Sequence, residues 1–319
     1  MSDEGERAEP DDAANPIREV VPAALDGQRL DRIVSLVADV SRSEAAATID
    51  AGGVRVDGAE APSGKVRLAE GQEVAVDVTA IPVVEMPGPD PHVTFGVVHV
   101  DDSVVVVDKP PGLVVHPGSG NRSGTLANGL LARFPDVVDV GDRMRPGIVH
   151  RLDAGSSGLL VVARTQHAAD ALSAQFVDHS AGRTYDAVVW GVPEATHGII
   201  DAPLGRSRSD PLRMAVVADG RPSRTDYRVI SAYSEPTTMS RVECRLETGR
   251  THQIRVHLSS IGHPLIGDPV YGQRRPHLGL ERPFLHATEL EFTHPTSGER
   301  VAFRSPLAPD LRAWLDAAS

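Results

Sequence analysis

Residues 145–164, RPGIVHRLDAGSSGLLVVAR, determine the expected fold more than any other stretch of the chain. An extended segment leads from a proline–glycine pair to Asp153, and a turn rich in glycine and serine, residues 155–158, follows it. Glycine permits turns and close backbone approaches that other residues resist. The apolar run 159–163 then indicates a buried strand. The pattern predicts a carboxylate that is held in one place where a core strand begins.

This stretch resembles the catalytic motif of the RluA-type family of RNA pseudouridine synthases, which reads H-R-L-D-x-x-[ST]-S-G-L-L. Asp153 occupies the position of the family's catalytic aspartate, and Ser156 stands where threonine is usual. The resemblance implies an isomerase that converts uridine in RNA to pseudouridine. Because that reaction breaks a C–N bond and rebuilds a C–C bond to the same sugar, no cofactor is expected. Arg151 is the candidate to hold RNA when the uridine leaves its stack.

Two further blocks stand in the family's order, one before this motif and one after it. Residues 108–117, DKPPGLVVHP, are similar to D-K-P-x-G-L-x-V-H-P, and Lys109 is expected either to brace this loop or to touch RNA phosphate. Residues 183–191 are similar to K-x-Y-x-A-x-x-x-G, so Tyr185 corresponds to the family's active-site tyrosine. A tyrosine there can stack on the flipped base, and its hydroxyl can help to remove the C5 proton.

A last block, residues 246–257 with the sequence LETGRTHQIRVH, is similar to the family pattern T-G-R-x-H-Q-I-R-x-H. We expect a strand over 251–257, in which Gln253 and Arg255 share one face. Burial raises the pKa of a carboxylate, whereas a nearby arginine lowers it. Arg255 is therefore the candidate ion partner of Asp153, and both are expected to be catalytic.

The same block offers one more basic residue and two histidines. Arg250 directly follows a glycine and is a candidate phosphate contact. His252 and His257 are five positions apart, so they would point to opposite faces of a strand and would not share a metal ion. We expect no metal site.

Beyond residue 92, short valine-rich strands outnumber helices and are separated by glycine and proline turns. This grouping predicts an α+β catalytic domain built on a mixed or antiparallel sheet. The expected strands are 97–107, 148–152, 159–164, 185–190, 224–230, 242–248, 251–257 and 289–292, and the expected helices are 124–133 and 166–178.

Residues 21–80 predict a small separate domain that resembles the S4 RNA-binding domain. Apolar residues from Leu30 to Val37 follow helical spacing, SRSE at 41–44 matches a capping box for a second helix, and Asp57-Gly58 is typical of a hairpin. The resemblance implies an αα-hairpin that binds RNA. Its candidate contacts are Arg29, Arg42 and Arg55.

The flanking segments have distinct compositions. Residues 1–20 contain seven acids and no aromatic residue, which predicts a disordered acidic tail. Residues 81–91 contain four prolines and predict a semi-rigid linker. The catalytic domain is thereby expected over 92–319.

The composition narrows the class of protein. A net charge of −12 argues against nucleic acid at first sight, but only the field at the binding face needs to be positive. A single cysteine, Cys244, excludes a disulfide framework. Since no signal peptide or long apolar run is evident, we expect a cytoplasmic protein without membrane contact. We also expect a monomer.

Several alternatives stay open. The domain pairing favours large-subunit (23S) ribosomal RNA as substrate, whereas transfer-RNA enzymes share the catalytic motifs. A non-catalytic RNA-binding protein of ribosome assembly would keep the fold without the reaction. A serine hydrolase would use Ser156 or Ser157, although the sequence GSSG differs from the G-x-S-x-G nucleophile elbow.

Overall fold

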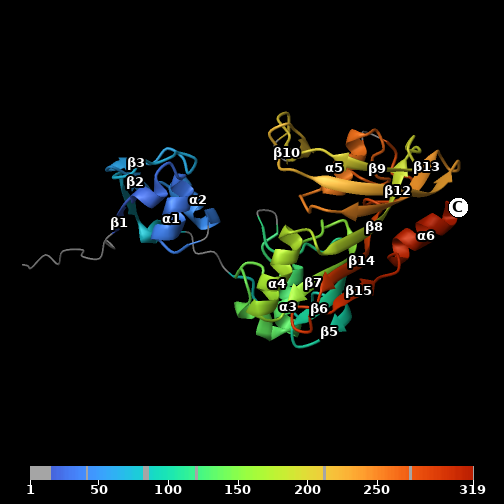
Figure 1. The fold of residues 1–319 in the computed structure, drawn as a ribbon, viewed down its shortest axis with the longest axis horizontal. Coiled ribbons are helices and arrows are strands. Elements are labelled where there is room, and N and C mark those ends of the chain that lie inside the picture. Colours follow the sequence, from blue (N-terminus) through green and yellow to red (C-terminus); the bar gives the residue numbers. More distant parts are fainter. Residues whose placement is uncertain are drawn as a thin grey trace, which may run out of the picture. The chain divides into compact units, whose positions relative to one another are not determined.

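The computed structural model describes residues 16–40, 42–81, 86–118, 121–210, 213–272 and 275–318. The chain divides into two compact units, residues 1–85 and 86–319 (Figure 1). Each unit encloses a hydrophobic core of its own. Within the described ranges, none of the helices is long and apolar enough to cross a membrane.

The N-terminal unit combines two helices, α1 (Leu30–Val37) and α2 (Arg42–Asp50), with a small antiparallel sheet. The helical spacing of its apolar residues is confirmed, because Leu30, Ile33 and Val34 are all buried. Ser41, the first residue of the predicted capping box, lies outside the described residues. The sheet has the order β1-β4-β2-β3 and consists of β1 (Ile17–Val20), β2 (Val54–Val56), β3 (Ala59–Glu60) and β4 (Glu73–Val76).

Two expected boundaries are wrong. The acidic tail was expected to reach residue 20, but residues 17–20 form β1, which pairs with β4 along its whole length. The linker was expected to reach residue 91, but Asn128 Nδ2 donates to the Gly88 carbonyl at 2.8 Å and the Asp90 amide donates to the Asn128 carbonyl at 2.9 Å. Hydrogen bonding therefore extends both units into segments whose composition indicated a disordered tail and a semi-rigid linker.

The second unit is an α+β domain around a nine-stranded sheet of order β5-β6-β7-β14-β8-β13-β12-β9, with β15 beside β14. The β7–β14 pair is parallel and the other pairs are antiparallel, so the expected mixed sheet is confirmed. A separate hairpin pairs β10 (Leu204–Arg206) with β11 (Met214–Val216). The strands of the large sheet are β5 (Gly96–Val100), β6 (Val104–Lys109), β7 (Ser157–Ala163), β8 (Gly182–Trp190), β9 (His197–Asp201), β12 (Arg224–Tyr233), β13 (Met239–Leu246), β14 (Leu285–Thr293) and β15 (Arg300–Arg304).

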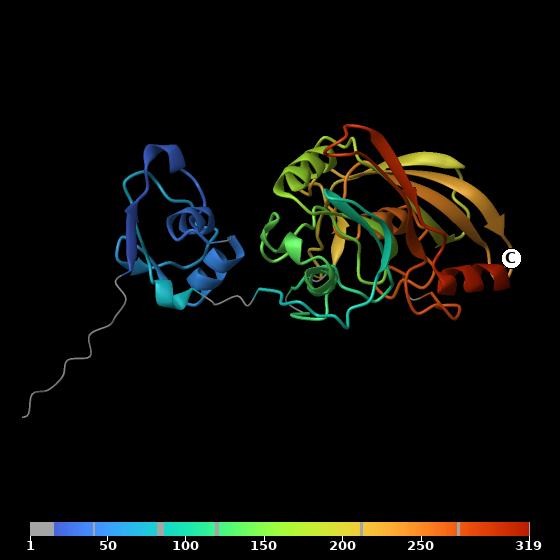
Figure 2. The same cartoon turned by 90° about the horizontal axis from the view of Figure 1, so that it is seen from below.

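Helices cover both faces of this sheet, as Figure 2 shows for α3 (Leu126–Arg133) and α4 (Gln166–Val177). Helix α3 packs on the face that carries Leu160 and Val162, and α4 packs on the face that carries Leu159 and Val161. Strand β7 is consequently buried along its full length. This explains why its sequence is continuously apolar rather than alternating. The remaining helices are α5 (Gln253–Ser260) and α6 (Pro309–Ala317).

Three strand predictions are wrong. Residues 251–257 were expected to be a strand, but Gln253 begins helix α5, whose first six residues are all buried. Short segments that are buried all round carry neither a helical nor a strand period. Residues 148–152 form an isolated bridge at Ile148 and no strand. Residues 97–107 form two strands, because Asp101 accepts hydrogen bonds from the Ser103 and Val104 amides and turns the chain.

Gly158 permits the β7–β14 contact that brings the turn after Asp153 to the sheet. Its φ is +109°, and an added Cβ would lie 2.3 Å from the Ala287 carbonyl oxygen. Gly158→Ala should therefore lower the free energy of unfolding by about 3 kcal/mol or more, measured by urea denaturation. Gly112→Ala is the matched control, since its φ is +83° but nothing lies within 4 Å; it should cost about 1–2 kcal/mol. Equal losses would contradict the close-approach argument.

Candidate active site

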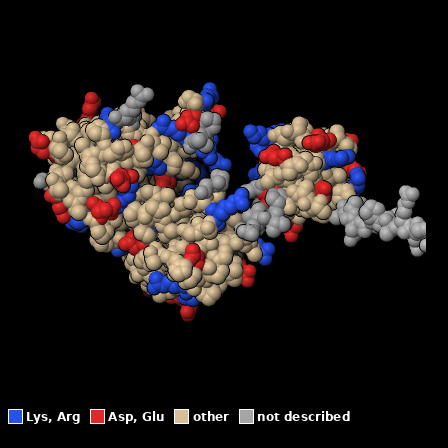
Figure 3. All heavy atoms as spheres, turned by 180° about the vertical axis from the view of Figure 1, so that it is seen from behind, with Lys and Arg blue, Asp and Glu red and all other residues tan. Residues whose placement is uncertain are grey.

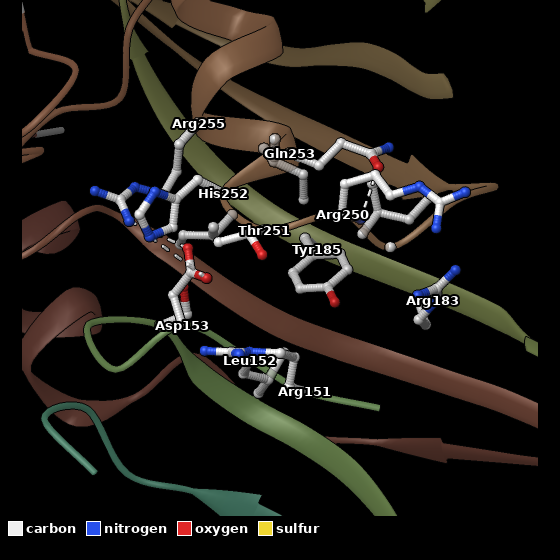
Figure 4. Close-up of a pocket in the computed structure, with 15 residues that line it drawn as sticks. Arg151, Leu152, Asp153, Arg183, Tyr185, Arg250, Thr251, His252, Gln253 and Arg255 are labelled. Atoms are coloured by element: carbon white, nitrogen blue, oxygen red, sulfur yellow. Dashed lines mark hydrogen bonds and ion pairs between the residues drawn. The ribbon is translucent and has the colours of Figure 1, made fainter. Parts of the chain in front are cut away.

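A pocket in the second unit brings together residues of the three blocks that surround Asp153, Tyr185 and Arg255 (Figure 4). Its described lining contains four arginines and one carboxylate, that of Asp153. Basic side chains also gather around the hollow on the face shown in Figure 3. The local charge is thus positive although the chain carries a net charge of −12, which is the condition that RNA binding requires.

The Asp153 carboxylate is held by the guanidinium of Arg255. Arg255 Nη1 lies 3.2 Å from Asp153 Oδ2, so the predicted ion pair is present. Arg255 also forms a two-point pair with Asp268, with Nε–Oδ2 at 2.8 Å and Nη2–Oδ1 at 3.0 Å. The Asp268 side chain is fully buried and also accepts hydrogen bonds from the Val270 and Tyr271 amides. The pairing with Asp268 consequently fixes the position of the guanidinium of Arg255 that faces Asp153.

The electrostatics of this triad agree with the geometry. Burial by itself lowers the pKa of Arg255, but the two carboxylates outweigh burial and raise it above its ordinary value. Burial raises the pKa of Asp268, yet its bonds to Arg255 and to backbone amides leave it below the ordinary value. The ring of Tyr271 lies 5.0 Å from the Arg255 guanidinium and completes its surroundings. The two carboxylates keep Arg255 charged, and its guanidinium is the cation that faces Asp153.

Of the two roles expected for Lys109, the structure supports bracing of the loop and not contact with RNA phosphate. Its side chain is fully buried, and Nζ donates to the carbonyls of Pro110 at 2.9 Å, Leu113 at 2.9 Å and Ala154 at 3.2 Å. Three carbonyls match the three N–H groups of a protonated amine. Burial lowers the pKa of Lys109 to about 7, against the opposing effect of Asp153. Lys109 therefore braces the loop and the catalytic turn and cannot reach phosphate.

Two other groups hold the turn that follows Asp153. The Gly112 amide donates to the Ala154 carbonyl at 2.8 Å. Arg282 Nη1 donates to the Gly155 carbonyl at 3.1 Å, and the same guanidinium pairs with Asp310 at 2.6 and 2.8 Å. Since Asp310 lies in α6, the C-terminal helix contributes to the position of the turn that follows Asp153.

Tyr185 lies on β8 and presents its ring to the pocket between Asp153 and Arg183 (Figure 4). Burial raises its pKa, so its hydroxyl is protonated at neutral pH. Arg183, from the same block, is buried, donates to the Glu247 carbonyl at 3.1 Å and lies over the Phe176 ring at 5.2 Å. The block therefore supplies a stacking surface and a buried cation to one side of the pocket.

The predicted RNA-contacting arginines of this unit lie at the pocket. Arg151 is exposed, with Nη1 3.4 Å from His116 Nε2. Arg250 is half-buried, and its Nε donates weakly to the Pro222 carbonyl at 3.4 Å. Both residues line the pocket with guanidiniums that are not fully buried, and Arg250 lies across Tyr185 from Asp153 (Figure 4).

Two of the three predicted RNA-contacting arginines of the N-terminal unit share one carboxylate. Asp31 pairs with Arg29, and Arg42 Nη2 lies 3.1 Å from Asp31 Oδ1. Hydrogen bonds from Arg29 lower the pKa of Asp31 despite its burial. Arg55 is exposed on β2, where Glu60 is its neighbour across the hairpin. Asp31 therefore orients two guanidiniums whose outer faces are open to solvent.

The serines of the catalytic turn are poorly placed for nucleophilic attack. Ser157 Oγ lies 2.9 Å from His286 Nδ1, but both side chains are nearly inaccessible. The Ser156 hydroxyl is buried and has no partner within the described part of the chain. A nucleophile must reach its substrate, so this pair supports core packing and not hydrolysis.

Sequence reasoning missed the roles of four residues. His150 is a fully buried strut whose Nε2 accepts from the Val161 amide at 3.0 Å, and burial lowers its pKa to about 3. His252 was considered as a metal ligand alone, yet its Nε2 lies 4.0 Å from Asp153 Oδ1. Asp268 and Tyr271 were not among the predicted site residues, yet Asp268 pairs with Arg255 and the Tyr271 hydroxyl lies 2.9 Å from His252 Nδ1. No group of three potential metal ligands converges among the described residues.

Comparison with known proteins gives a consistent result. Residues 103–260 match the family described as RNA pseudouridylate synthase. An RNA pseudouridine synthase of Chloroflexus aurantiacus is 45% identical over 297 residues, which cover 93% of this chain and 92% of that protein. The ribosomal large subunit pseudouridine synthase D of Nitrosomonas europaea is 42% identical, over 97% of this chain and 92% of its own.

A solved structure is also similar. Human RNA pseudouridylate synthase domain containing 1 is 29% identical, with a TM-score of 0.56, and the match covers 71% of this chain and 89% of that one. The likeness therefore extends to the three-dimensional arrangement of a large part of the chain.

The brace formed by Lys109 can be tested through stability. Lys109→Met should lower the free energy of unfolding by about 2–5 kcal/mol, because buried carbonyls lose their donor. The measurement is urea denaturation at pH 7. Lys65, the other lysine of the chain, is exposed, so Lys65→Met is the control and should change stability by less than about 0.5 kcal/mol. An unaltered midpoint for Lys109→Met would refute the bracing role.

Proposed function

Because this chain belongs to the family of RNA pseudouridine synthases, we propose that it acts on large-subunit ribosomal RNA, with Asp153 as its catalytic carboxylate. It is an isomerase that converts uridine to pseudouridine in RNA. The ribosomal substrate is supported by relatives from several bacteria that are named ribosomal large subunit pseudouridine synthase D and that match over more than 90% of this chain.

The observation that carries the proposal is the ion pair of Asp153 with Arg255 beside Tyr185 in one pocket. In the reaction the C1′–N1 bond breaks, the uracil turns, and a C1′–C5 bond forms. C5 then loses its proton and N1 gains one, so no electrons leave the substrate. An ionised carboxylate can either attack C1′ or remove the 2′ proton to give a glycal, and in both routes the guanidinium of Arg255 would hold the Asp153 carboxylate in place.

Tyr185 and the arginines at the pocket complete the proposed mechanism. The flipped uracil would stack on the Tyr185 ring, and the hydroxyl, kept protonated by burial, would donate a hydrogen bond rather than act as a base. Arg151 would hold the RNA where the uridine leaves its stack, and Arg250 would contact phosphate. A protonated hydroxyl cannot take the C5 proton as a base. Tyr185 would therefore help in C5 deprotonation only by accepting one proton while it releases its own.

The N-terminal unit is proposed to be an S4-like RNA-binding domain. Its support is the pair of helices followed by a hairpin and the Asp31 carboxylate that orients Arg29 and Arg42. Arg55 is a further proposed contact. We also propose that the protein acts as a monomer, in the cytoplasm where ribosomal RNA is found.

Asp153→Asn tests the reaction and its substrate together. The amide cannot act as the carboxylate does, so pseudouridine formation should become undetectable while RNA affinity stays within a few-fold. The measurement is carbodiimide-stop sequencing of total RNA from cells without the gene, complemented by wild type or by the variant.

The outcome of this mapping separates the alternatives. Signals that disappear at large-subunit positions and return with wild type alone support the proposal. Signals that disappear only in transfer RNA would retain the chemistry and replace the substrate. An unchanged map would favour a non-catalytic role in ribosome assembly.

Salt dependence tests the N-terminal arginines. Arg29→Gln with Arg42→Gln should weaken binding to a ribosomal RNA fragment and reduce the slope of log K against log salt by about 1 for each lost phosphate contact. Arg18→Gln is the control, because Arg18 lies in the same unit and pairs with Glu73 on the exposed sheet. Identical slopes for the double variant and the control would contradict a specific RNA face.

A further inference from the structure

The two oxygens of the Asp153 carboxylate have different neighbours. Arg255 Nη1 approaches Oδ2 at 3.2 Å, whereas His252 Nε2 is 4.0 Å from Oδ1. Figure 4 shows the His252 ring beside the carboxylate and the Arg255 guanidinium. A separation of 4.0 Å is about 1 Å longer than a hydrogen bond. Active-site hydrogen bonds are often long without substrate and tighten in the complex.

The hydroxyl group of Tyr271 lies beside one nitrogen of the His252 ring. The Met214 amide donates to Tyr271 Oη at 3.0 Å, and His252 Nδ1 lies 2.9 Å from the same oxygen. These are the polar partners of that hydroxyl within the described residues. Because the amide can only donate, the hydroxyl proton is directed to Nδ1. The neutral imidazole then carries its hydrogen on Nε2, the nitrogen that faces Asp153.

The surroundings favour the neutral ring. Burial lowers the pKa of His252, and the positive charges of Arg255 and Arg151 add to this effect, while Asp153 and Asp268 oppose it. At neutral pH the ring is accordingly an uncharged donor, not a second cation.

The backbone holds the ring in this place. His252 has φ +57° and ψ 22°, the left-handed conformation, immediately before helix α5. That conformation is uncommon for residues other than glycine and costs about 1 kcal/mol. The next residue, Gln253, fixes the turn because its Oε1 accepts from the Arg250 amide at 3.0 Å and from the Thr248 hydroxyl at 2.7 Å. The strain is thus retained where it aims the imidazole at the carboxylate.

We propose that His252 is a positioning residue for the catalytic carboxylate: Tyr271 fixes its Nε2–H tautomer, which donates to Asp153 Oδ1, the oxygen that Arg255 leaves free. The inference rests on the proposed function of Asp153. With one donor on each oxygen, the carboxylate has a single orientation toward the ribose. Arg255 holds one oxygen of the carboxylate, and His252 determines the rotation of the group.

Two amide substitutions separate this role from general packing. The amide nitrogen of Gln reaches the place of Nε2, so His252→Gln keeps a donor toward Asp153. The shorter His252→Asn places its amide near Nδ1, so it retains contact with Tyr271 but not with Asp153. Asparagine tolerates the left-handed conformation well, and thermal melts of both full-length variants verify that they fold.

The readout is the single-turnover rate on an RNA fragment that contains a mapped uridine. His252→Asn should reduce the rate at saturating enzyme by about 10- to 100-fold, which is the effect of losing one hydrogen bond to a charged group. RNA affinity should be unchanged, and His252→Gln should retain the rate within about 3-fold by the same reasoning. A wild-type rate in His252→Asn, or equal losses in both variants, would overturn the proposal.

The role of Tyr271 provides a second readout. NMR spectra of the full-length protein with ¹⁵N-labelled histidine report the tautomer of each ring. The His252 signals are identified because they are absent from the spectrum of His252→Asn. In the wild type they should show an unprotonated Nδ1 and a protonated Nε2. Tyr271→Phe should shift them toward a mixture of tautomers and slow the reaction in the wild type but not in His252→Gln. A protonated Nδ1 in the wild type would contradict the assignment.

Failure of this inference is distinguishable from failure of the proposed function. If wild type forms pseudouridine, Asp153→Asn does not and His252→Asn matches wild type, only the positioning role is wrong. If wild type forms none in any RNA, the function of Asp153 is wrong as well, whereas the tautomer measured by NMR still stands on its own.

Discussion

The guanidinium of Arg255 joins the carboxylates of Asp153 and Asp268. Asp153 lies 102 positions from Arg255 in the chain, and Asp268 lies 13 positions from it. A buried arginine is costly unless it is paired. Asp268 meets this requirement with two hydrogen bonds and is itself held by backbone amides. The guanidinium therefore has a fixed position, and one nitrogen stays available for Asp153. The geometry of the pocket depends on both ion pairs of Arg255. The pair with Asp268 fixes the guanidinium, and the pair with Asp153 uses the nitrogen that remains.

The backbone around Asp153 is restrained in the same way. Strand β7 is buried on both faces and positions the turn from one side. Lys109 and Arg282 donate to carbonyls of the turn from distant parts of the chain. Carbonyls at a turn that lacks strand partners need donors from elsewhere when they are buried. Lysine and arginine serve here as donors to the backbone, so their charge contributes to geometry and not to RNA binding.

The sequence predicted the chemistry of the site better than its local structure. The pairing of Asp153 with Arg255 follows from the need of a sheltered carboxylate for a cation, and it is present although 251–257 is largely helical and not a strand. For Lys109 the sequence left bracing and phosphate contact open; the three carbonyls that decide for bracing become visible only in the fold. The link between His252 and Tyr271 spans 19 positions, so no local pattern could reveal it.

Net charge was a poor guide for a related reason. Several acidic residues that contribute to the value of −12 are used to orient arginines, among them Asp31 beside Arg29 and Arg42, and Asp268 beside Arg255. A carboxylate in this role reduces the total charge but leaves the outer face of the guanidinium free to donate, in a direction that the acid has fixed. Arginine is suited to this use because its planar group can bind two partners at once. Acidic residues can thereby define a basic surface, and the arrangement of charges, not their sum, indicates what the surface binds.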